Sequence, residues 1–310
     1  MVVANSGHVR TVPVTVAPFS VADVALGPLA PGTGAAAVVD LEGGQAAAEL
    51  VVAGGPDGDV TPCASAGSER WLFADGSTAR DASLSLSLFN PFPEDAIADM
   101  AFSTDEGRAV PADLQGVVVP ARSLVVKEIG EKVRRRESIA TTVAVRTGRL
   151  VAAQSQGRTA PGRAGASVAL GSPSPGRLWY FPDGLTSDTV TERYSLFNPG
   201  AREAEVSVEV NLDQGAAEPF EVTVPAGDRV TLTLNTESRI PKGVGHSAVV
   251  RSSNDVPVVA WRSLEVSGSS AAGRADVLGA RRAARRWLFP AGGVDPAFDE
   301  LVVVLNPGPG

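Results

Sequence analysis

The chain has 310 residues, of which 44% are hydrophobic and 20% are charged, and its mean hydropathy is +0.08. This composition can form a buried core, which excludes an intrinsically disordered polyelectrolyte, and the length suits two or three domains. The formal net charge of −8 argues against nucleic acid as a partner, because phosphate binding needs a basic surface.

Beginning at the N-terminus, residues 1–7 lack the basic and apolar regions of a signal peptide, and no apolar stretch is long enough for a transmembrane helix. Residues 14–18 (Val-Thr-Val-Ala-Pro) and 34–39 (Gly-Ala-Ala-Ala-Val-Val) are a weak copy of a pattern that recurs further on. We therefore expect residues 1–62 to be the C-terminal part of a β-sandwich unit.

The clearest signal is a block of the form Trp-Φ-Phe, where Φ is Leu or Tyr, which occurs three times at equal intervals along the chain. An Asn-Pro pair follows each block, always at the same distance from the Trp. Residues repeated in register with a fold are expected to be part of its core. The predicted structural anchors are Trp71, Phe73, Asn90, Trp179, Phe181, Asn198, Trp287, Phe289 and Asn306.

Between these blocks the hydrophobic residues recur with a period of two, as in half-buried strands. In residues 83–88, Leu alternates with Ser, and in residues 205–210, Val alternates with Glu or Ser. Residues 117–121 (Val-Val-Val-Pro-Ala) match residues 222–226 (Val-Thr-Val-Pro-Ala). The whole pattern indicates about seven strands in roughly 90 residues.

The predicted fold is all-β, with tandem immunoglobulin-like antiparallel β-sandwich units whose repeat period is 108, the step from position 71 to 179 and from 179 to 287. Two units are expected to be whole, at residues 70–157 and 178–266, and the N-terminal part of another at 287–310. Residues 157–177 and 266–286 are rich in Gly, Ala, Ser and Arg, which favours linkers. The partial units predict exposed apolar strand edges at 302–305 and a chain that is a fragment of a longer array, or one with a wrongly assigned start.

The order Trp-Φ-Phe-x-x-Gly, a strand ending in Asn-Pro, a Val-x-Val-Pro-Ala turn and a Val-Pro-Val-Val-Ala strand resembles an uncharacterised actinobacterial exported-protein family, domain of unknown function 5719. It also resembles the immunoglobulin-like repeats of bacterial surface proteins. The resemblance covers most of the chain and implies architecture and location, namely an extracellular or cell-envelope protein. It implies no catalytic residue.

Few residues suit a chemical site. Cys63 is the only cysteine, and only His8 and His246 could act as imidazole ligands or bases, so we expect no disulfide, metal, cofactor or catalytic centre. Trp261 occurs in one copy of the unit only, which makes it the candidate for ligand binding.

The predicted function is therefore that of a non-catalytic extracytoplasmic scaffold or spacer, with a cell-wall polymer or another envelope protein as its partner. The alternative is a carbohydrate-binding or adhesin module, in which sugars stack on Trp261 or on the tryptophans of the repeated block.

Overall fold

The computed structural model describes residues 2–4, 9–18, 20–30, 34–54, 57–212, 215–268, 272–289 and 301–308. These residues form antiparallel strands and two short 3-10 turns, η1 (Ala112–Leu114) and η2 (Leu234–Thr236), without an α-helix. The predicted all-β class is confirmed. In the described residues no helix has the length and apolarity that a membrane span requires.

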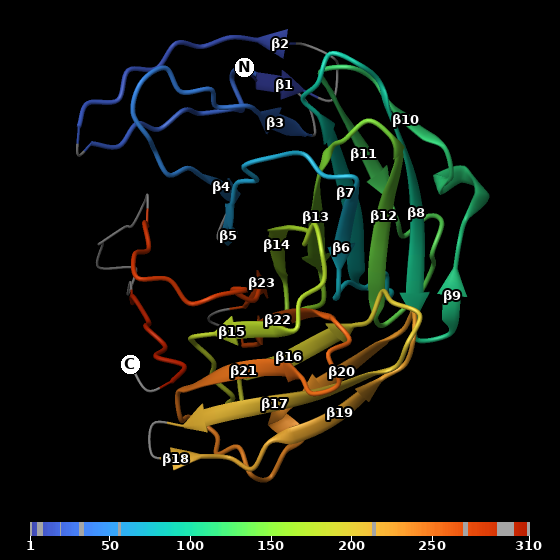
Figure 1. The fold of residues 1–310 in the computed structure, drawn as a ribbon, viewed down its shortest axis with the longest axis vertical. Helices are drawn as coiled ribbons and strands as arrows, with labels where there is room; N and C mark the ends of the chain where they lie inside the picture. The colour runs from blue at the N-terminus through green and yellow to red at the C-terminus, as the bar shows by residue number, and fades with distance from the viewer. Residues whose placement is uncertain are drawn as a thin grey trace.

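Strands between residues 70 and 170 form two sheets that face each other across a hydrophobic core (Figure 1). The first sheet has the order β10-β8-β12-β6, with β9 paired to β8. Its strands are β6 (Arg70–Phe73), β8 (Ala96–Thr104), β9 (Gly107–Ala109), β10 (Val117–Val119) and β12 (Ile139–Thr147). The second has the order β11-β7-β13-β14 and contains β7 (Ala82–Asn90), β11 (Ser123–Glu128), β13 (Val151–Arg158) and β14 (Gly165–Leu170). We call these two sheets the first sheet pair.

Residues 178–278 form a second sheet pair with the same order of the main strands. One sheet has the order β15-β21-β17-β18, with β19 paired to β17. Its strands are β15 (Leu178–Phe181), β17 (Ala204–Leu212), β18 (Gly215–Ala216), β19 (Phe220–Val224) and β21 (His246–Ser252). The other has the order β20-β16-β22-β23 and contains β16 (Val190–Phe197), β20 (Arg229–Thr233), β22 (Val259–Val266) and β23 (Gly273–Leu278).

The N-terminal part contributes two smaller sheets. A three-stranded sheet has the order β2-β1-β3, with β1 (Val2–Ala4), β2 (Val9–Arg10) and β3 (Ala35–Ala37). A separate hairpin joins β4 (Glu49–Gly54) to β5 (Asp57–Pro62). The N-terminal segment therefore holds short strands that are divided between two sheets.

The alternating pattern of the sequence decides which side chains enter the core. Leu84, Leu86 and Leu88 of β7 are at most 1% exposed, whereas the serines between them point away from the core. The valines of β17 at 206, 208 and 210 are buried in the same way. Burying each such aliphatic side chain contributes roughly 1.5–3 kcal/mol, so the period-two pattern stabilises the pairing of the sheets.

The two segments expected to be linkers each contain a strand instead. β14 pairs with β13 along its whole length, and β23 pairs with β22 in the same way. The linker interpretation is therefore wrong for residues 165–170 and 273–278. Gly, Ala and Ser gave these segments a loop-like composition, but backbone hydrogen bonds to an existing strand do not depend on large side chains.

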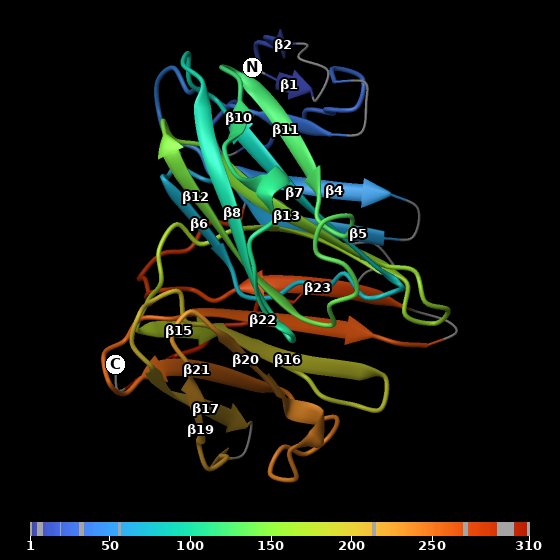
Figure 2. The same cartoon turned by 90° about the vertical axis from the view of Figure 1, so that its right-hand side faces the viewer.

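The last strands of successive parts of the chain lie side by side near the centre of the molecule. β14 contacts both β5 and β23. Figure 2 shows the strands of the first sheet pair standing steeply above those of the second, which run nearly across the view. One end of the first pair therefore meets the outer face of the sheet that contains β16 and β22.

Candidate functional site: the charged junction between the sheet pairs

The junction between the two sheet pairs is centred on Arg274, a buried residue of β23. Its Nη2 lies 2.6 Å from Asp75 Oδ2 of the first sheet pair. Its Nε lies 2.8 Å from Asp276 Oδ2, and its Nη2 also donates to Asp276 Oδ1 at 2.8 Å. Ser167 of β14 donates a hydrogen bond to Asp276 as well. One guanidinium thus connects carboxylates that belong to both pairs.

This arrangement keeps the guanidinium charged. Burial disfavours the charged form of Arg274, but Asp276 and Asp75 outweigh burial and raise the pKa of Arg274 above its usual value. Breaking such a buried pair is costly because it leaves an uncompensated charge out of contact with water. The network therefore fixes the relative position of the strands that carry it.

Asp59 of β5 ties the N-terminal hairpin to the same junction. Its Oδ2 accepts a hydrogen bond of 2.6 Å from the backbone N–H of Val168 on β14. Burial raises the pKa of the Asp59 carboxyl, and the backbone hydrogen bonds from Val168 and Val60 partly oppose that rise. The negative charge of Asp276 on β23 also raises the pKa of Asp59.

A second ion-pair cluster lies farther along β22. Glu265 Oε1 is 2.5 Å from Arg163 Nη2, in the turn before β14, and Glu265 Oε2 is 3.2 Å from Arg193 Nη1 on β16. Burial acts to raise the pKa of Glu265, but the two arginines outweigh it and hold the pKa below its usual value. Glu265 is 1% exposed, whereas the side chains of Arg163 and Arg193 are 45% and 30% exposed, so the cluster is only partly shielded from water.

Trp261 is the apolar contact of the junction rather than an exposed platform. It is 0% exposed, and its ring centroid lies 6.2 Å from that of Phe73 in the first sheet pair. Neighbouring polar contacts join Ser195 to Asp75 and Ser103 to Asp228. The expectation that Trp261 binds a ligand at the surface is therefore wrong in this structure, because another part of the chain covers the indole.

The tryptophans of the first two blocks have matching environments. Trp71 is 2% exposed and donates its indole N–H to the carbonyl of Leu150 at 2.8 Å. Trp179 is 0% exposed and donates to the carbonyl of Val258 at 3.0 Å. Phe73 and Phe181 are buried beside them. The predicted anchors of both blocks therefore lie in the core.

The two asparagines of the Asn-Pro pairs also have matching roles. Asn90 Nδ2 donates to the carbonyls of Glu94 and Val119, and its Oδ1 accepts from the N–H of Phe92. Asn198 makes the same three bonds, to the carbonyls of Arg202 and Val224 and from the N–H of Gly200. Each buried amide thus stabilises the turn that follows its strand.

The third block differs from the first two. Trp287, Leu288 and Phe289 are 56%, 60% and 68% exposed, and Asn306 is exposed. The prediction of buried anchors is therefore wrong for Trp287, Phe289 and Asn306. The physical reason is that the described residues place no sheet over this block. Val302, Val303 and Val304 are exposed, as expected for that apolar segment, but they lie outside any strand.

A separate polar cluster lies inside the second sheet pair. Glu192 Oε2 on β16 is 2.8 Å from His246 Nε2 on β21, and both side chains are 0% exposed. The hydroxyl of Tyr194 donates to Glu192 Oε1 at 2.9 Å. Arg262 lies near, with its Nη1 3.8 Å from Asp183 Oδ2. Leu84 and Ile139 stand at the places of Glu192 and His246 in the first sheet pair.

This cluster has the residue types of an acid-base site but is sealed. Burial acts to lower the pKa of His246, yet the hydrogen bond and charge of Glu192 outweigh it and raise the pKa above 6.5. Gly184 lies against the pair, because a Cβ at that position would come 2.6 Å from His246 Nε2. A substrate would have to displace this backbone, so the cluster is best understood as a core ion pair.

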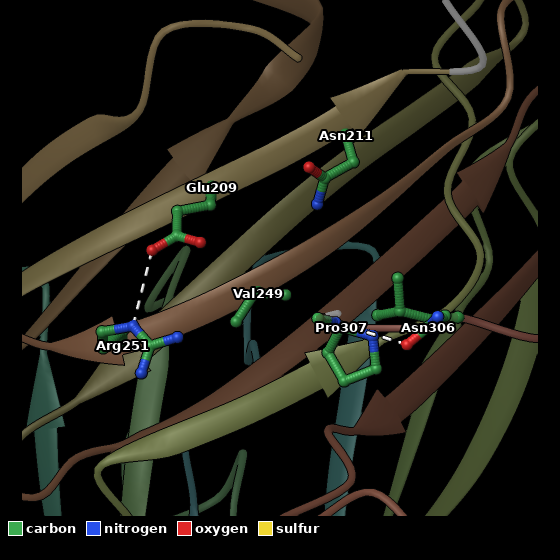
Figure 3. A pocket seen from close by; sticks show the side chains of 8 residues that line it. Glu209, Asn211, Val249, Arg251, Asn306 and Pro307 are labelled. Atoms are coloured by element: carbon green, nitrogen blue, oxygen red, sulfur yellow. Dashed lines mark hydrogen bonds and ion pairs between the residues drawn. The ribbon is translucent and has the colours of Figure 1, made fainter. Parts of the chain in front are cut away.

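Open surface depressions offer little for a ligand. A pocket of about 350 Å³ lies on the outer face of β17 and β21, beside residues 305–308 (Figure 3). Glu209, Asn211, Val249 and Arg251 line its floor, and Arg251 Nε pairs with Glu209 Oε1 at 3.5 Å. None of its lining residues is aromatic, so the pocket lacks the flat ring that sugar stacking requires.

Sequence reasoning missed the junction and the Glu192 cluster. Arg274 and Asp276 lay in a segment interpreted as a linker, and Glu192 and His246 are far apart in the sequence and belong to different sheets. The one available signal was the pair Arg274-x-Asp276, whose i, i+2 spacing a strand places on a single face.

The chain is an all-β protein of paired antiparallel sheets, with buried anchor residues and a charged junction between the pairs. The family described as "Family of unknown function (DUF5719)" matches residues 59–293, and the chain belongs to this family.

Two solved structures are similar to parts of it. The crystal structure of Thermotoga maritima 1070 is 23% identical, with a TM-score of 0.33, and the match covers 35% of this chain and 97% of that chain. The Anabaena sensory rhodopsin transducer is also 23% identical, with a TM-score of 0.26 and coverage of 28% and 94%. Among curated proteins no relative matches this chain.

Proposed function

We propose that the protein is a non-catalytic scaffold in which immunoglobulin-like sandwich units, repeating at regular intervals along the chain, are held in a fixed mutual arrangement. The observation that carries this proposal is the Arg274 network, in which one buried guanidinium joins Asp75 of the first sheet pair to Asp276 of the second. A flexible string of domains would have exposed linkers there instead.

Two further observations support a structural task. The imidazole and carboxylate best suited to acid-base chemistry, His246 and Glu192, are paired in the core and closed off by Gly184. Trp71, Trp179 and Trp261, which could have stacked on sugars, are at most 2% exposed. These side chains stabilise the fold and are unavailable to a ligand, which favours the scaffold over the carbohydrate-binding alternative.

The test is to remove the junction without touching either core. Arg274→Met should leave Asp75 and Asp276 buried without a cation, so the two sheet pairs should separate. Small-angle scattering should show a larger radius of gyration, and calorimetry should resolve two transitions instead of one. Arg282→Met is the matched control, because Arg282 is exposed and has no ion pair among the described residues.

A second variant distinguishes the cost of leaving the two carboxylates unpaired from the cost of losing the Arg274 contacts themselves. Asp75→Asn combined with Arg274→Met and Asp276→Asn removes all three charges together, and it should recover part of the stability. If Arg274→Met instead keeps the wild-type scattering curve and a single transition, the junction does not fix the arrangement and the scaffold proposal fails.

We further propose that the protein acts outside the cytoplasm, with a cell-wall polymer or another envelope protein as its partner. The support is the resemblance to exported proteins. Fractionation of the native cells, followed by immunodetection in the envelope and culture fluid, tests the compartment. A glycan array tests the rival function, and saturable binding to one glycan class would favour carbohydrate recognition over a spacer.

A further inference from the structure

The N-terminal sheet has the same order as its counterparts but lacks one strand. In the first pair, β12 lies between β8 and β6, and in the second, β21 lies between β17 and β15. In the N-terminal sheet, β3 has β1 on one side and no partner on the other among the described residues. An open strand edge offers unpaired N–H and C=O groups.

The position of β3 in the chain identifies the missing neighbour. β3 precedes the hairpin β4–β5 as β12 precedes β13–β14 and as β21 precedes β22–β23. The last strands of these three groups, β5, β14 and β23, begin at Asp57, Gly165 and Gly273, which are equally spaced along the chain. The place beside β3 therefore corresponds to the places of β6 and β15.

The described chain contains a third segment of the type found in β6 and β15, and this segment is not paired with any strand. β6 ends in Trp71-Leu72-Phe73, and β15 ends in Trp179-Tyr180-Phe181. The third such segment, Trp287-Leu288-Phe289, is more than half exposed at every residue. The sheet thus lacks a strand of this type, and the segment lacks a sheet.

We propose that residues 287–289 pair antiparallel with the free edge of β3 in the same chain. Glu42, Leu150 and Val258 are spaced along the chain at the same interval as the three tryptophans. The indole N–H of Trp287 then donates to the carbonyl of Glu42, as Trp71 does to Leu150 and Trp179 to Val258. The completed sheet has the order β2-β1-β3 followed by the added strand. The segments from the two ends of the described chain then share one sheet.

Cys63 becomes part of the same contact. At Gly171 a Cβ would lie 2.7 Å from the Phe73 ring, and at Gly279 a Cβ would lie 2.7 Å from the Phe181 ring. Cys63 occupies the corresponding position in the N-terminal part, where its thiol is exposed. Pairing of residues 287–289 therefore places the Phe289 ring over Cys63, displaced outward by the cysteine Cβ.

The arrangement of the central strands favours pairing within one chain. β23, which the Trp287 segment follows, packs against β14, and β14 packs against β5. The charge of Asp276 on β23 raises the pKa of Asp59 on β5. Figure 1 shows β5, β14 and β23 together near the centre, with the N-terminal sheet above them and the C-terminal segment to their left. The incoming strand therefore departs close to the hairpin that belongs with β3.

The N-terminal sheet contacts the first sheet pair in the way that the first sheet pair contacts the second. In the junction of the sheet pairs, β8 meets the residue before β20 through the hydrogen bond from Ser103 to Asp228. Likewise β1 contacts β11, and Ala36 and Val38 pack against Phe89 and Leu124. The sheet that receives the strand is thus already in place.

The test uses Cys63 as a reporter in the full chain. The rate of thiol modification by N-ethylmaleimide should be slow in the wild type, because the Phe289 ring covers the sulfur. Leu288→Pro removes a backbone N–H and prevents strand pairing, and it should raise the rate by at least about tenfold. Hydrogen exchange of residues 35–37 should accelerate in the same variant.

Ala283→Pro is the matched control, because the corresponding position in the preceding segment is already a proline, Pro175. It should leave the thiol rate and the exchange of β3 unchanged. The proposal is overturned if N-ethylmaleimide modifies Cys63 of the folded wild type as fast as it modifies the urea-unfolded protein. It is also overturned if Leu288→Pro changes neither the rate of thiol modification nor the hydrogen exchange of residues 35–37. Light scattering measures the oligomeric state in the same experiment. If Cys63 and β3 are protected only when the protein forms a concentration-dependent dimer, the strand comes from a second copy and pairing within the chain is overturned.

Discussion

Asn90 and Asn198 show how much structure a single side chain can hold in this protein. Each buried amide bonds to two carbonyls and accepts one backbone N–H, which closes a turn that would otherwise leave polar groups unpaired in the core. Trp71 and Trp179 act in a similar way, since each combines a large apolar surface with one satisfied indole N–H. At the residue scale the repeated positions are therefore structural.

Replacing Trp71 or Trp179 with Ala should lower the free energy of unfolding by about 3–5 kcal/mol. The loss combines a core cavity with the loss of the indole hydrogen bond to the carbonyl of Leu150 or Val258, which keeps its second bond from the N–H of Ser68 or Gly176. Urea unfolding followed by circular dichroism measures it. Val118→Ala is the control, because Val118 is 51% exposed in β10 and should change stability by less than about 0.5 kcal/mol. Equal effects at Trp71 and Val118 would contradict the anchor role.

The Glu192–His246 pair makes a pH prediction. Because the folded pKa of His246 lies above its unfolded value of 6.5, the stabilisation from its protonated form is fully present below pH 6.5. That stabilisation is lost as pH rises through the folded pKa. Urea unfolding at a series of pH values should therefore show this contribution falling on the alkaline side of 6.5.

The control for that pH dependence comes from the first sheet pair, where Leu84 and Ile139 occupy the corresponding places. Glu192→Leu with Tyr194→Phe and His246→Ile should keep the fold, since apolar replacement of a whole buried pair is often tolerated. The component of stability that titrates above pH 6.5 should disappear. Its persistence in the triple variant would assign the pH dependence to other groups.

At the scale of elements, β14 and β23 are the informative strands. Both lie at a sheet edge, β14 with mostly small residues and β23 with Arg274 and Asp276 among its residues, and the two strands contact each other. The N–H of Val168 bonds to Asp59 and the N–H of Leu170 lies 3.3 Å from Thr61 Oγ1, so side chains of β5 satisfy the outer edge of β14. This use of side chains limits further strand addition there.

Hydrogen exchange distinguishes a paired strand from a linker in these segments. Residues 165–170 and 273–278 should be protected to a degree close to that of β13 and β22, because half of their N–H groups belong to the ladder. Residues 282–286, which are exposed and outside any strand, should exchange rapidly in the same experiment. Equally fast exchange in all three segments would show that β14 and β23 are not stably formed.

At the scale of the whole molecule, the sheet pairs are joined by ion pairs, by the packing of β14 against β23 and by one aromatic contact. Arg274, Asp276 and Glu265 are buried, and their polar contacts with Asp75 and Arg163 of the first sheet pair favour one relative orientation of the two pairs. Trp261 against Phe73 excludes water from the same junction. The junction therefore behaves as part of the fold.

Acid should weaken this junction through Glu265. The folded pKa of Glu265 lies below its usual 4.5, so its contribution is present above pH 4.5 and is lost as pH falls through the folded value. Thermal unfolding between about pH 6 and pH 3 should show a steeper acid loss in the wild type than in Glu265→Gln. Glu218→Gln, at a side chain that is 89% exposed, should retain the wild-type slope; equal slopes in all three proteins would contradict the role of Glu265.

The sequence by itself determined the strand class, the anchors Trp71, Trp179, Asn90 and Asn198, and the inward faces of β7 and β17. These depend on local periodicity and on residue types that have one favourable environment. Only the tertiary structure decided the burial of Trp261, the partners of Arg274 and the pairing of β14 and β23 with their neighbouring strands. Those outcomes depend on which surfaces meet, and contacts between residues that are distant in the chain leave no period in the sequence. Trp287 makes the same point, because it is 56% exposed where no described strand lies beside it and would be buried only in a completed sheet.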